Sequence, residues 1–452
     1  MKIRASGVDP GAHPLRICTV QPSGNTRIVT LAVLPYRSLV HLEPSFHVVG
    51  ISHHMAPVEE RERFALTPAE VAALLGQQSA AGRSSLLLCT CNRCELYWTG
   101  DADLEPWFRG FAEARGTSTR VPLLRYDGLT AVRHLFTVAA GLDSQILGET
   151  EILGQVRRAY DTAAAAGTTT RDMDLIFSSA LAAGRRVRSE TLLGRHPKSV
   201  SSAAIDLVAQ QWGGIGARPV VVLGAGEAAE SVLRSLHEHG ASKVWLLNRR
   251  PLRAQALADA WGATAGRWEE LDQQLGAADL VVVATGSARA VVSAAHVARA
   301  VEQRPGRELY LMDLSVPRNV EPDARDIAGV HLFDLDDLER ACCPAAGRPS
   351  AALHEAEAVL DAELDRLGLS LRGKLVAPKL AELHRLGVEL AEQESAWALA
   401  RLESLSDDDR EIVRQMADRL VRRVLYPVSR NLRENGSGAG SREPGAAGSS
   451  PV

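Results

Sequence analysis

Cysteine, aromatic residues and positive charge are all in short supply in this chain of 452 residues. It has six cysteines, its aromatic share is 4% and its formal net charge is −4. So few cysteines in so long a chain favour a reducing compartment over a disulfide-stabilised secreted protein. The negative net charge excludes a general attraction for nucleic acid, so contact with RNA would need a local basic patch.

Long hydrophobic runs are also missing. No run of eighteen apolar residues occurs, so no segment is expected to span a membrane. The N-terminus lacks the charged segment, apolar core and cleavage site of a secretory signal, and a cytoplasmic protein is expected. The hydrophobic share of 46% and the charged share of 23% are typical of folded domains. The length predicts two or three such domains.

The pattern along the chain predicts an α/β protein in several parts. The N-terminal folded part reads as α+β: "FHVVGISHH" and "SSLLLCTC" as strands, a helix capped by Thr67, Pro68 and Glu70, and helices over residues 129–211. Strands and helices then alternate, which indicates a Rossmann-type domain. Helical periodicity returns before a Gly/Ser/Pro tail that cannot form a core. The expected segments are an irregular extension at 1–45, an α+β domain at 46–205, a Rossmann-type domain at 206–345, an all-helical domain at 346–435 and a disordered tail at 436–452.

The string "VVVLGAGEAAE" predicts a dinucleotide site, because a strand runs into glycines and then directly into a helix. Glycines let the backbone approach a pyrophosphate, whose charge is stabilised by the helix N-terminus. An NAD site expects an acidic residue about twenty positions later, but this chain has "NRR" there, and two guanidiniums suit the 2′-phosphate of NADPH. The predicted cofactor residues are Gly224, Ala225, Gly226, Glu227, Ala228, Ala229, Asn248, Arg249 and Arg250.

Three cysteines cluster in "LLLCTCNRCELY", which leaves a metal site, a disulfide or a nucleophile as alternatives. Zinc would need about four ligands, and no second suitable pair follows, so no metal is predicted. Cys89 is interpreted as an ordinary buried residue, and a bond between Cys89 and Cys91, two apart on one strand, is disfavoured. Cys91 stands at the strand's end beside Arg93, a cation expected to lower the pKa of the thiol. A nucleophilic cysteine together with NADPH suggests reduction of a thioester to an aldehyde.

Seven strings in this order resemble the glutamyl-tRNA reductase family: "VVGISHHMAPVEERERFAL", "TCNRCELY", "HLFTVAAGLDSQILGETEILGQVRRAY", "GRRVRSET", "VLGAGEAAE", "NRR" and "LMDLSVPRNVEP...FDLDDL". The resemblance implies a cytosolic homodimer that uses NADPH to reduce glutamyl-tRNA(Glu) to glutamate-1-semialdehyde, the first step of tetrapyrrole biosynthesis from glutamate. It also implies three domains joined along a long helix: a catalytic glutamate-recognition domain at 46–205, an NADPH-binding Rossmann domain at 206–345 and a dimerisation domain at 346–435. The glutamate-1-semialdehyde aminomutase that acts next is a candidate partner.

The resemblance assigns roles position by position. Cys91 matches the nucleophile and His134 the histidine that assists it, although His134 taken alone would more often be structural. Thr90, Asn92 and Arg93 would line the glutamate site, where Arg93 suits a carboxylate. The remaining recognition positions, which could otherwise be helix caps and surface charges, are Ser144, Glu149, Thr150, Glu151 and Gln155.

The chain departs from the family at a few positions. Glu151 replaces the usual Gln. Its charge would help to hold the substrate's ammonium, or would repel the substrate's carboxylate unless Glu151 binds a proton or pairs with an arginine, for which Arg93 is the candidate. Cys89 and Cys94 replace Ser and Thr, which places two more oxidisable thiols near the nucleophile. The C-terminal "RRVLYPVSRNLRE" follows the family only loosely. These departures leave room for a paralogue that supplies 5-aminolevulinate to a secondary pathway.

Two further patterns have both a structural and a functional interpretation. The run "GRRVRSETLLGRHPK" is either a solvated helix face or a tRNA contact through Arg185, Arg186, Arg188, Arg195 and Lys198. An apolar stripe broken at Gly387 and Glu394 favours packing between subunits and consists of Val376, Leu380, Leu383, Leu390 and Trp397. Two alternative functions stay open: a tRNA-independent reductase of an acyl thioester or acyl phosphate, and a non-catalytic paralogue, which should have lost Cys91 or the glycine turn.

Overall fold

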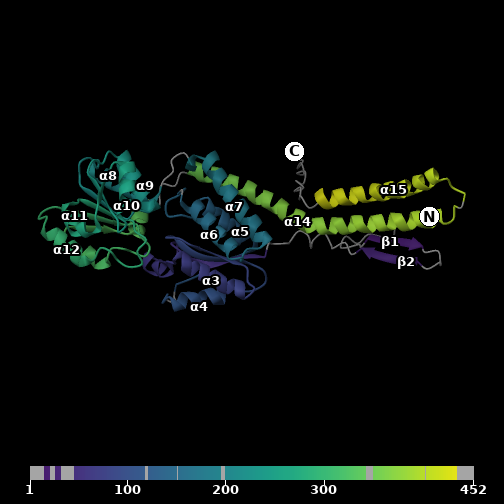
Figure 1. Cartoon of the computed structure of the whole chain (residues 1–452), viewed down its shortest axis with the longest axis horizontal. Helices are drawn as coiled ribbons and strands as arrows, with labels where there is room; N and C mark the ends of the chain where they lie inside the picture. The colour runs from purple at the N-terminus through teal and green to yellow at the C-terminus, as the bar shows by residue number, and fades with distance from the viewer. Residues whose placement is uncertain are drawn as a thin grey trace, which may run out of the picture. The chain divides into compact units, whose positions relative to one another are not determined.

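The computed structural model describes residues 15–20, 26–31, 45–117, 121–149, 151–194, 199–342, 350–402 and 404–434. They divide into two units, one within residues 45–364 and one drawn from residues 1–44 and 365–452. Figure 1 shows the elements of both along the chain. Within this described part of the chain, no helix combines the length and apolarity needed to cross a membrane.

The N-terminal part of the first unit is built on a four-stranded antiparallel sheet in the order β4-β5-β3-β6. Its strands are β3 (Phe46–Ser52), β4 (Ser85–Cys89), β5 (Arg93–Thr99) and β6 (Leu124–Asp127). Its helices are α2 (Val58–Arg61), η1 (Glu62–Phe64), α3 (Pro68–Ala80), α4 (Glu105–Ala114), α5 (Gly128–Ala139), α6 (Glu151–Ala165), α7 (Arg171–Glu190) and η2 (Leu192–Gly194). The predicted cap of α3 is confirmed: the Thr67 hydroxyl accepts from the Glu70 N–H, and the Glu70 carboxylate accepts from the Thr67 N–H.

An aromatic cluster fixes this sheet against its helices. Phe46 of β3, Tyr97 of β5 and Phe177 of α7 are fully buried, with ring centroids 5.7 to 6.1 Å apart. Such aromatic contacts add stability beyond the area that they bury. They hold β5 in place, and therefore also the turn that precedes it.

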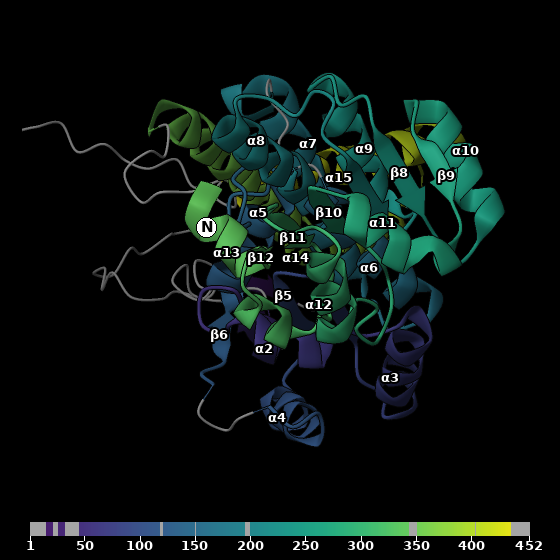
Figure 2. The same cartoon turned by 90° about the vertical axis from the view of Figure 1, so that its left-hand side faces the viewer.

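The dinucleotide-binding part contains a six-stranded parallel sheet in the order β12-β11-β10-β7-β8-β9 (Figure 2). This is the doubly wound order of a Rossmann fold, and the strand order reverses between β7 and β10. The strands are β7 (Val220–Leu223), β8 (Val244–Leu247), β9 (Thr264–Gly266), β10 (Leu280–Val283), β11 (Leu309–Asp313) and β12 (Val330–Phe333). The helices are α8 (Val200–Trp212), α9 (Glu227–Glu238), α10 (Pro251–Trp261), η3 (Trp268–Glu270), α11 (Leu271–Ala277), α12 (Ala294–Glu302), η4 (Pro322–Asp326) and α13 (Leu335–Cys342).

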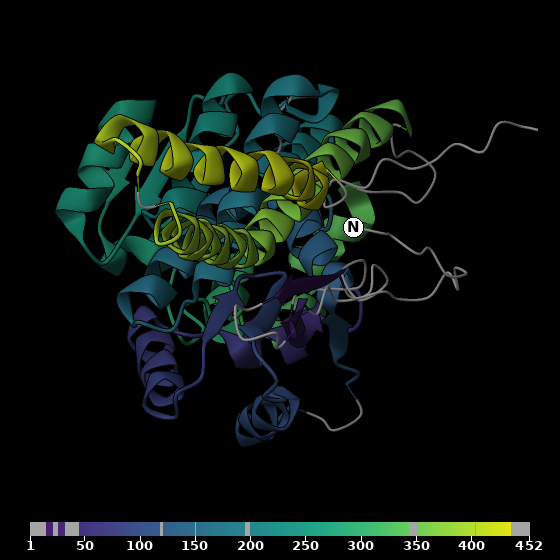
Figure 3. The same cartoon turned by 90° about the vertical axis from the view of Figure 1, so that its right-hand side faces the viewer.

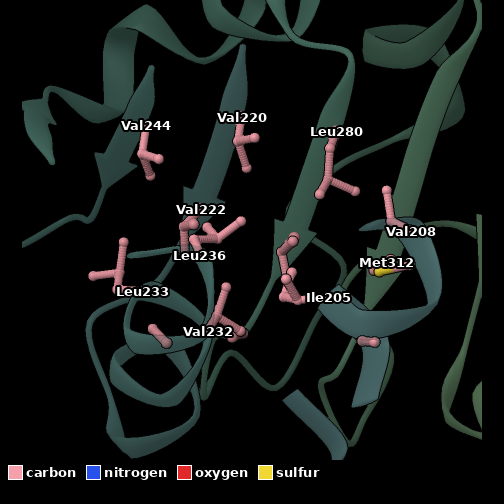
Figure 4. Packing of buried hydrophobic residues seen from close by; sticks show 14 of the residues in the cluster. Ile205, Val208, Val220, Val222, Val232, Leu233, Leu236, Val244, Leu280 and Met312 are labelled. Atoms are coloured by element: carbon pink, nitrogen blue, oxygen red, sulfur yellow. The ribbon is translucent and has the colours of Figure 1, made fainter. Parts of the chain in front are cut away.

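Alternate residues of β7 enter two separate cores, one on each face of the sheet. Val220 and Val222 pack against α8, α9 and α10, as the close view in Figure 4 shows for α8 and α9. Val221 and Leu223 pack on the opposite face, where α11 and α12 supply the partners. Both faces of a parallel sheet are covered in this way, so its strands are continuously apolar rather than alternating. The Rossmann prediction is confirmed, although β9 and β12 were not predicted as strands.

Two long helices, α14 (Ser350–Leu399) and α15 (Asp407–Glu434), follow, and they run side by side (Figures 1 and 3). A Cβ on Gly387 would lie 2.6 Å from Leu425 and 2.8 Å from Val421, so this glycine permits the close contact between the helices. The residue that breaks the apolar stripe in the sequence is thus a point of contact between the two helices. Val376, the first residue of that stripe, has a side chain outside the described set.

The N-terminal extension contains a hairpin that the sequence interpretation missed. β1 (Leu15–Val20) pairs antiparallel with β2 (Thr26–Leu31). Both strands are rich in β-branched residues, which favour extended structure. The prediction of an irregular extension is therefore wrong over these two segments, and the tail at 436–452 lies outside the described residues.

Candidate functional site

Cys91 lies in the tight turn between β4 and β5, two residues beyond the end of β4. The Thr90 N–H donates to the Arg93 carbonyl at 2.7 Å, and the Asn92 N–H donates to the Thr90 hydroxyl at 3.1 Å. From outside the turn, the His53 N–H donates to the Asn92 carbonyl at 2.8 Å. These bonds fix the backbone of the turn and leave Cys91 with a free thiol; the residue as a whole is partly exposed.

The other two cysteines of the cluster form a disulfide across the hairpin, between Cys89 and Cys94. The adjacent pair Thr90 and Arg93 carries the backbone hydrogen bond, so Cys89 and Cys94 occupy a non-hydrogen-bonded pair, where side chains approach most closely. The interpretation of Cys89 as an ordinary buried residue was therefore wrong, because it considered only pairing along one strand. Cys91 is left as the free thiol of the cluster.

The electrostatic setting of Cys91 also differs from the prediction. Burial raises the pKa of its thiol to about 12, and Glu149 and Glu151 raise it further. The cation that opposes this rise is Arg61, not Arg93. Arg93 follows Cys91 closely in sequence, but its charge is already compensated by carboxylates. The thiol is therefore neutral near pH 7 when no substrate is bound beside it.

This setting predicts how Cys91 reacts with an alkylating agent. Because the thiolate is the reactive form, the rate of Cys91 carbamidomethylation by iodoacetamide should rise about tenfold per pH unit between pH 7 and 9, without a plateau. Peptide mass spectrometry measures the rate at Cys91 itself, with the Cys91→Ser protein as the unlabelled control. A plateau near pH 8.5 would show an ordinary, unperturbed thiol instead.

Arg93 is fully buried and is held by two carboxylates. Its Nη1 donates to Asp143 Oδ2 at 2.7 Å and to Glu95 Oε1 at 3.1 Å, and its Nη2 donates to the Asp143 carbonyl. Burial acts to lower the pKa of Arg93, but Glu95 and Asp143 raise it, so the residue stays charged. Arg93, the candidate partner of Glu151, is therefore paired with Glu95 and Asp143 instead. Asp143 in turn accepts from His54 Nε2 at 2.8 Å, and it was missed although it stands in the quoted string "GLDS".

Glu95 is the centre of a second buried group that includes His134. Its carboxylate accepts from Tyr97 at 2.6 Å and from His134 Nε2 at 3.0 Å, besides the bond from Arg93. Burial opposes ionisation of Glu95, but His134 and Arg93 lower its pKa to about 2. Because Glu95 is ionised and can only accept, Nε2 of His134 donates in this bond, and Nδ1 is left for another partner. Gly50 lies opposite Glu95, and a Cβ there would meet the Glu95 side chain at 2.8 Å.

Of the recognition residues predicted outside the turn, Glu151 is the first residue of α6, and Ser144 and Glu149 precede that helix. Burial raises the pKa of both Glu149 and Glu151; Ser144 opposes the rise for Glu149, whereas Glu227 adds to it for Glu151. Gln155 follows Glu151 by four residues and so lies on the same face of α6. Thr150 lies outside the described residues. Two carboxylates with raised pKa beside a thiol form a site suited to a substrate cation.

The candidate dinucleotide site is a pocket of about 460 Å³ at the carboxyl ends of β7 and β10, where the strand order reverses. Of the predicted residues, Gly224, Ala225, Gly226, Asn248, Arg249 and Arg250 line it. Glu227, Ala228 and Ala229 do not: Ala229 is buried in the core below, and Glu227 faces Arg158 at 3.4 Å. The sequence interpretation missed Arg253, Trp268, Val291 and the segment 284–287 after β10, which also line the pocket. The Arg249 guanidinium lies 5.3 Å from the Trp268 ring.

The glycine turn fits a bound pyrophosphate. Gly224 has φ of +112°, and a Cβ on it would lie 2.1 Å from the Ala284 carbonyl, so no other residue fits there. A Cβ on Gly226, at the start of α9, would meet no atom within 4 Å, which leaves its backbone open to a ligand. The described residues that line the pocket include three arginines and no carboxylate. This set suits a cofactor with a 2′-phosphate.

The basic run does not form one described patch. Arg185 is exposed, Arg186 pairs with Glu363 at 2.6 Å and Glu190 at 2.7 Å, and Arg188 donates to the Glu149 carbonyl at 3.1 Å. Arg195 and Lys198 lie outside the described residues. The structure thus places Arg188 beside the candidate site rather than on a common surface with the others.

Comparison with known proteins agrees with these three structural parts. Residues 49–191 match the N-terminal domain of glutamyl-tRNA(Glu) reductase, residues 206–341 match shikimate/quinate 5-dehydrogenase, and residues 355–446 match the dimerisation domain of glutamyl-tRNA(Glu) reductase. The glutamyl-tRNA reductase of Pelotomaculum thermopropionicum is 36% identical over 392 residues, which cover 84% of this chain and 88% of that protein. That of Deinococcus radiodurans is 42% identical over 315 residues, 70% of this chain and 89% of the relative. The solved glutamyl-tRNA reductase of Methanopyrus kandleri is 30% identical, covers 87% of this chain and 99% of its own, and gives a TM-score of 0.42.

Proposed function

Because the chain belongs to the glutamyl-tRNA reductase family, we propose that it reduces the glutamyl ester of glutamyl-tRNA(Glu) to glutamate-1-semialdehyde, with NADPH as cofactor. The product would enter tetrapyrrole biosynthesis. The observation that carries the proposal is a free cysteine in the turn of the N-terminal part, within the same unit as an arginine-lined dinucleotide pocket.

Cys91 would act as the nucleophile. Its sulfur attacks the ester carbonyl, the bond to the ribose oxygen of the tRNA breaks, and the glutamyl group is held as a thioester. The leaving oxygen takes up the proton that the Cys91 thiol gives up, and His134 is the candidate group that accepts this proton at Nδ1 and passes it on. Bound NADPH would supply the hydride that turns the thioester into the aldehyde and releases the thiol.

The α-ammonium of the substrate would help to ionise Cys91. Glu149 and Glu151 both raise the pKa of the thiol, so a cation bound beside them offsets their charge and favours the thiolate. Such a site would keep the thiol neutral until the aminoacyl ester arrives. The proposed recognition residues are Thr90, Asn92 and the segment Glu149–Gln155. Arg93 instead helps to fix the turn, because its side chain is bonded to Asp143 and Glu95.

The decisive experiment is NADPH oxidation by the purified protein with glutamyl-tRNA(Glu). Free glutamate and glutamyl phosphate serve as alternative substrates, because a tRNA-independent reductase would use the phosphate. Oxidation that depends on charged tRNA supports the proposal. Oxidation with glutamyl phosphate alone would favour the second class of reductase.

The arginines of the pocket predict cofactor preference. Replacement of both Arg249 and Arg250 by alanine should raise the KM for NADPH at least tenfold and change that for NADH little, because only NADPH carries the 2′-phosphate. Steady-state kinetics with each cofactor measure the ratio. Arg234→Ala is the matched control, since Arg234 stacks on Trp261 at 5.4 Å and does not line the pocket. An unchanged preference in the double variant would place 2′-phosphate recognition elsewhere, with Arg253 the next candidate.

Replacement of Glu151 by glutamine, the usual residue of the family, is expected to have a mild effect on activity. Glu151→Gln removes a charge that raises the pKa of Cys91 and breaks no ion pair with Arg93. Activity on glutamyl-tRNA should stay within about tenfold, roughly 1.4 kcal/mol in activation free energy. A hundredfold loss in kcat/KM would mean that the pocket depends on this carboxylate, and the substrate would then need to be tested again.

The helical C-terminal part suits a homodimer. Along the described α15, the side chains of Ile412, Met416, Leu420 and Val424 are 56 to 65% exposed and recur every four residues, so they form one apolar stripe. A stripe of this kind would be buried by the same stripe of a second subunit. The aminomutase remains a candidate partner for the aldehyde product.

A further inference from the structure

A single buried arginine, Arg61 at the end of α2, touches both parts of the first unit. Its side chain is 2% exposed. Its Nε donates to the Cys91 carbonyl at 3.0 Å, and its Nη1 to the Ala56 carbonyl at 2.8 Å. Its Nη2 donates to Asp336 Oδ1 at 2.8 Å, across 275 positions of sequence. One guanidinium therefore bonds to the peptide of the nucleophile and to the dinucleotide-binding part.

Asp336, at the start of α13, accepts hydrogen bonds from three residues of the N-terminal part, two of them on α2. Besides Arg61, Gln145 Nε2 donates to its Oδ1 at 3.1 Å, and the Val58 N–H donates to its Oδ2 at 2.8 Å. The carboxylate is 18% exposed. Charge-assisted bonds of this kind are among the stronger polar contacts in proteins. Asp336 is thus a point at which the dinucleotide-binding part is attached to the N-terminal part.

Neighbouring contacts strengthen this attachment without reaching Cys91. Arg318, which follows β11, donates to Glu62 at 2.9 Å and to Glu59 at 2.6 Å. These bonds attach η1 and α2 to the dinucleotide-binding part. His53 also lies near both parts, since its N–H bonds to the turn and its Nε2 is 4.0 Å from Glu339. Burial, together with His54 and Arg93, lowers the pKa of His53 to about 3, so it carries no charge for Glu339 at neutral pH. The connection from the Cys91 carbonyl to α13 therefore runs through Arg61, which hydrogen-bonds to that carbonyl and forms an ion pair with Asp336.

We propose that Arg61 and Asp336 are positioning residues that keep the Cys91 turn and the dinucleotide-binding part in one fixed register. The purpose of this register rests on the proposed function, because an acyl group on Cys91 must meet a cofactor held by the other part. Neither residue touches the substrate. Arginine is needed at position 61, since its planar fork serves three acceptors at once and a lysine ammonium has no such geometry.

The first test requires no substrate. In Asp336→Ala, Arg61 loses its acceptor on α13, and its hold on the Cys91 carbonyl weakens. Amide hydrogen exchange in the peptide that covers residues 90–94 should become at least about threefold faster than in the wild type. Asp336→Asn keeps an oxygen acceptor and should give a smaller increase, and it also serves if the alanine variant folds poorly.

Asp337→Ala is the matched control for this exchange experiment. Asp337 is the next residue on α13, is 15% exposed and pairs with Arg325 and Arg340 of its own part. Its removal should leave exchange at residues 90–94 unchanged. Wild-type exchange in both Asp336 variants, or equal acceleration by Asp337→Ala, would overturn the proposal.

A kinetic test separates the register from general stability. Without NADPH, acylation of Cys91 by glutamyl-tRNA should remain within about threefold in Asp336→Ala, whereas reduction of the preformed acyl-enzyme on addition of NADPH should slow at least tenfold, about 1.4 kcal/mol. Equal losses in both steps would overturn the proposal. A wild-type protein that is not acylated at all would instead contradict the proposed function, and the exchange result would still decide the structural link.

Discussion

Replacement of Cys91 by serine is expected to abolish reduction of glutamyl-tRNA while the protein remains folded. A serine hydroxyl has no comparable anionic form near neutral pH and cannot form the thioester that is reduced. The loss in single-turnover rate should be at least about a thousandfold, roughly 4 kcal/mol in activation free energy. The turn should survive, because its bonds to Arg61, His53 and Arg93 all use backbone atoms of residues 90–93.

The neighbouring cysteines provide the control for this prediction. Cys89→Ser and Cys94→Thr each remove the disulfide, but the backbone hydrogen bond between Thr90 and Arg93 still closes the hairpin. Both variants should therefore retain most of the activity. The thermal unfolding midpoint and sedimentation of each variant report on the fold and the oligomer. If Cys91→Ser kept wild-type activity, the thioester mechanism would be wrong and another nucleophile would be needed.

The second large effect is expected at Glu95, whose removal should destabilise the protein. Glu95→Ala takes one of two carboxylates from the buried Arg93, and it leaves the Tyr97 hydroxyl and His134 Nε2 without their acceptor. Loss of one member of a buried ion pair costs about 3 kcal/mol of unfolding free energy or more. Urea unfolding measures this cost. Activity should also fall, because the His134 ring loses the bond that sets its orientation and its protonated nitrogen.

A surface ion pair is the control for Glu95. Asp161 pairs with Arg157 four residues away on α6, with both side chains more than half exposed. Asp161→Ala should change the free energy of unfolding by about 0.5 kcal/mol or less. A similarly small change for Glu95→Ala would mean that water reaches Glu95 and that the buried network does not hold the site.

The lowered pKa of Glu95 also predicts how the free energy of unfolding depends on pH. Its pKa is lowered from 4.5 to about 2 in the folded protein, chiefly through His134 and Arg93 acting against burial. A carboxylate with a lowered pKa stabilises the fold above its unfolded pKa, and this contribution is lost as the pH falls through the folded value. The stability difference between wild type and Glu95→Gln should therefore shrink between about pH 4.5 and pH 2.

Local patterns were sufficient for most of the fold. The capping box at Thr67 acts within four residues, and its geometry is set before any tertiary contact forms. The apolar strands and the glycine turn at Gly224 are equally local, since the strand must be buried on both faces and the turn cannot accept a Cβ. Short elements such as β9 and β12 were missed, because three or four residues give no periodicity to detect.

The sequence by itself determined the parts of this protein: the strand-turn-helix of a dinucleotide site, the helical C-terminal segment and a cysteine in a family-specific string. These depend on residue type and spacing over a few turns of chain. Tertiary structure alone decided which charges meet. Arg93 bonds to Asp143 and Glu95 rather than Glu151, Arg61 joins Cys91 to Asp336 across 275 positions, and the thiol has a raised pKa. The physical reason is that electrostatic and hydrogen-bonding partners are set by distance and burial in space, which residue spacing does not encode.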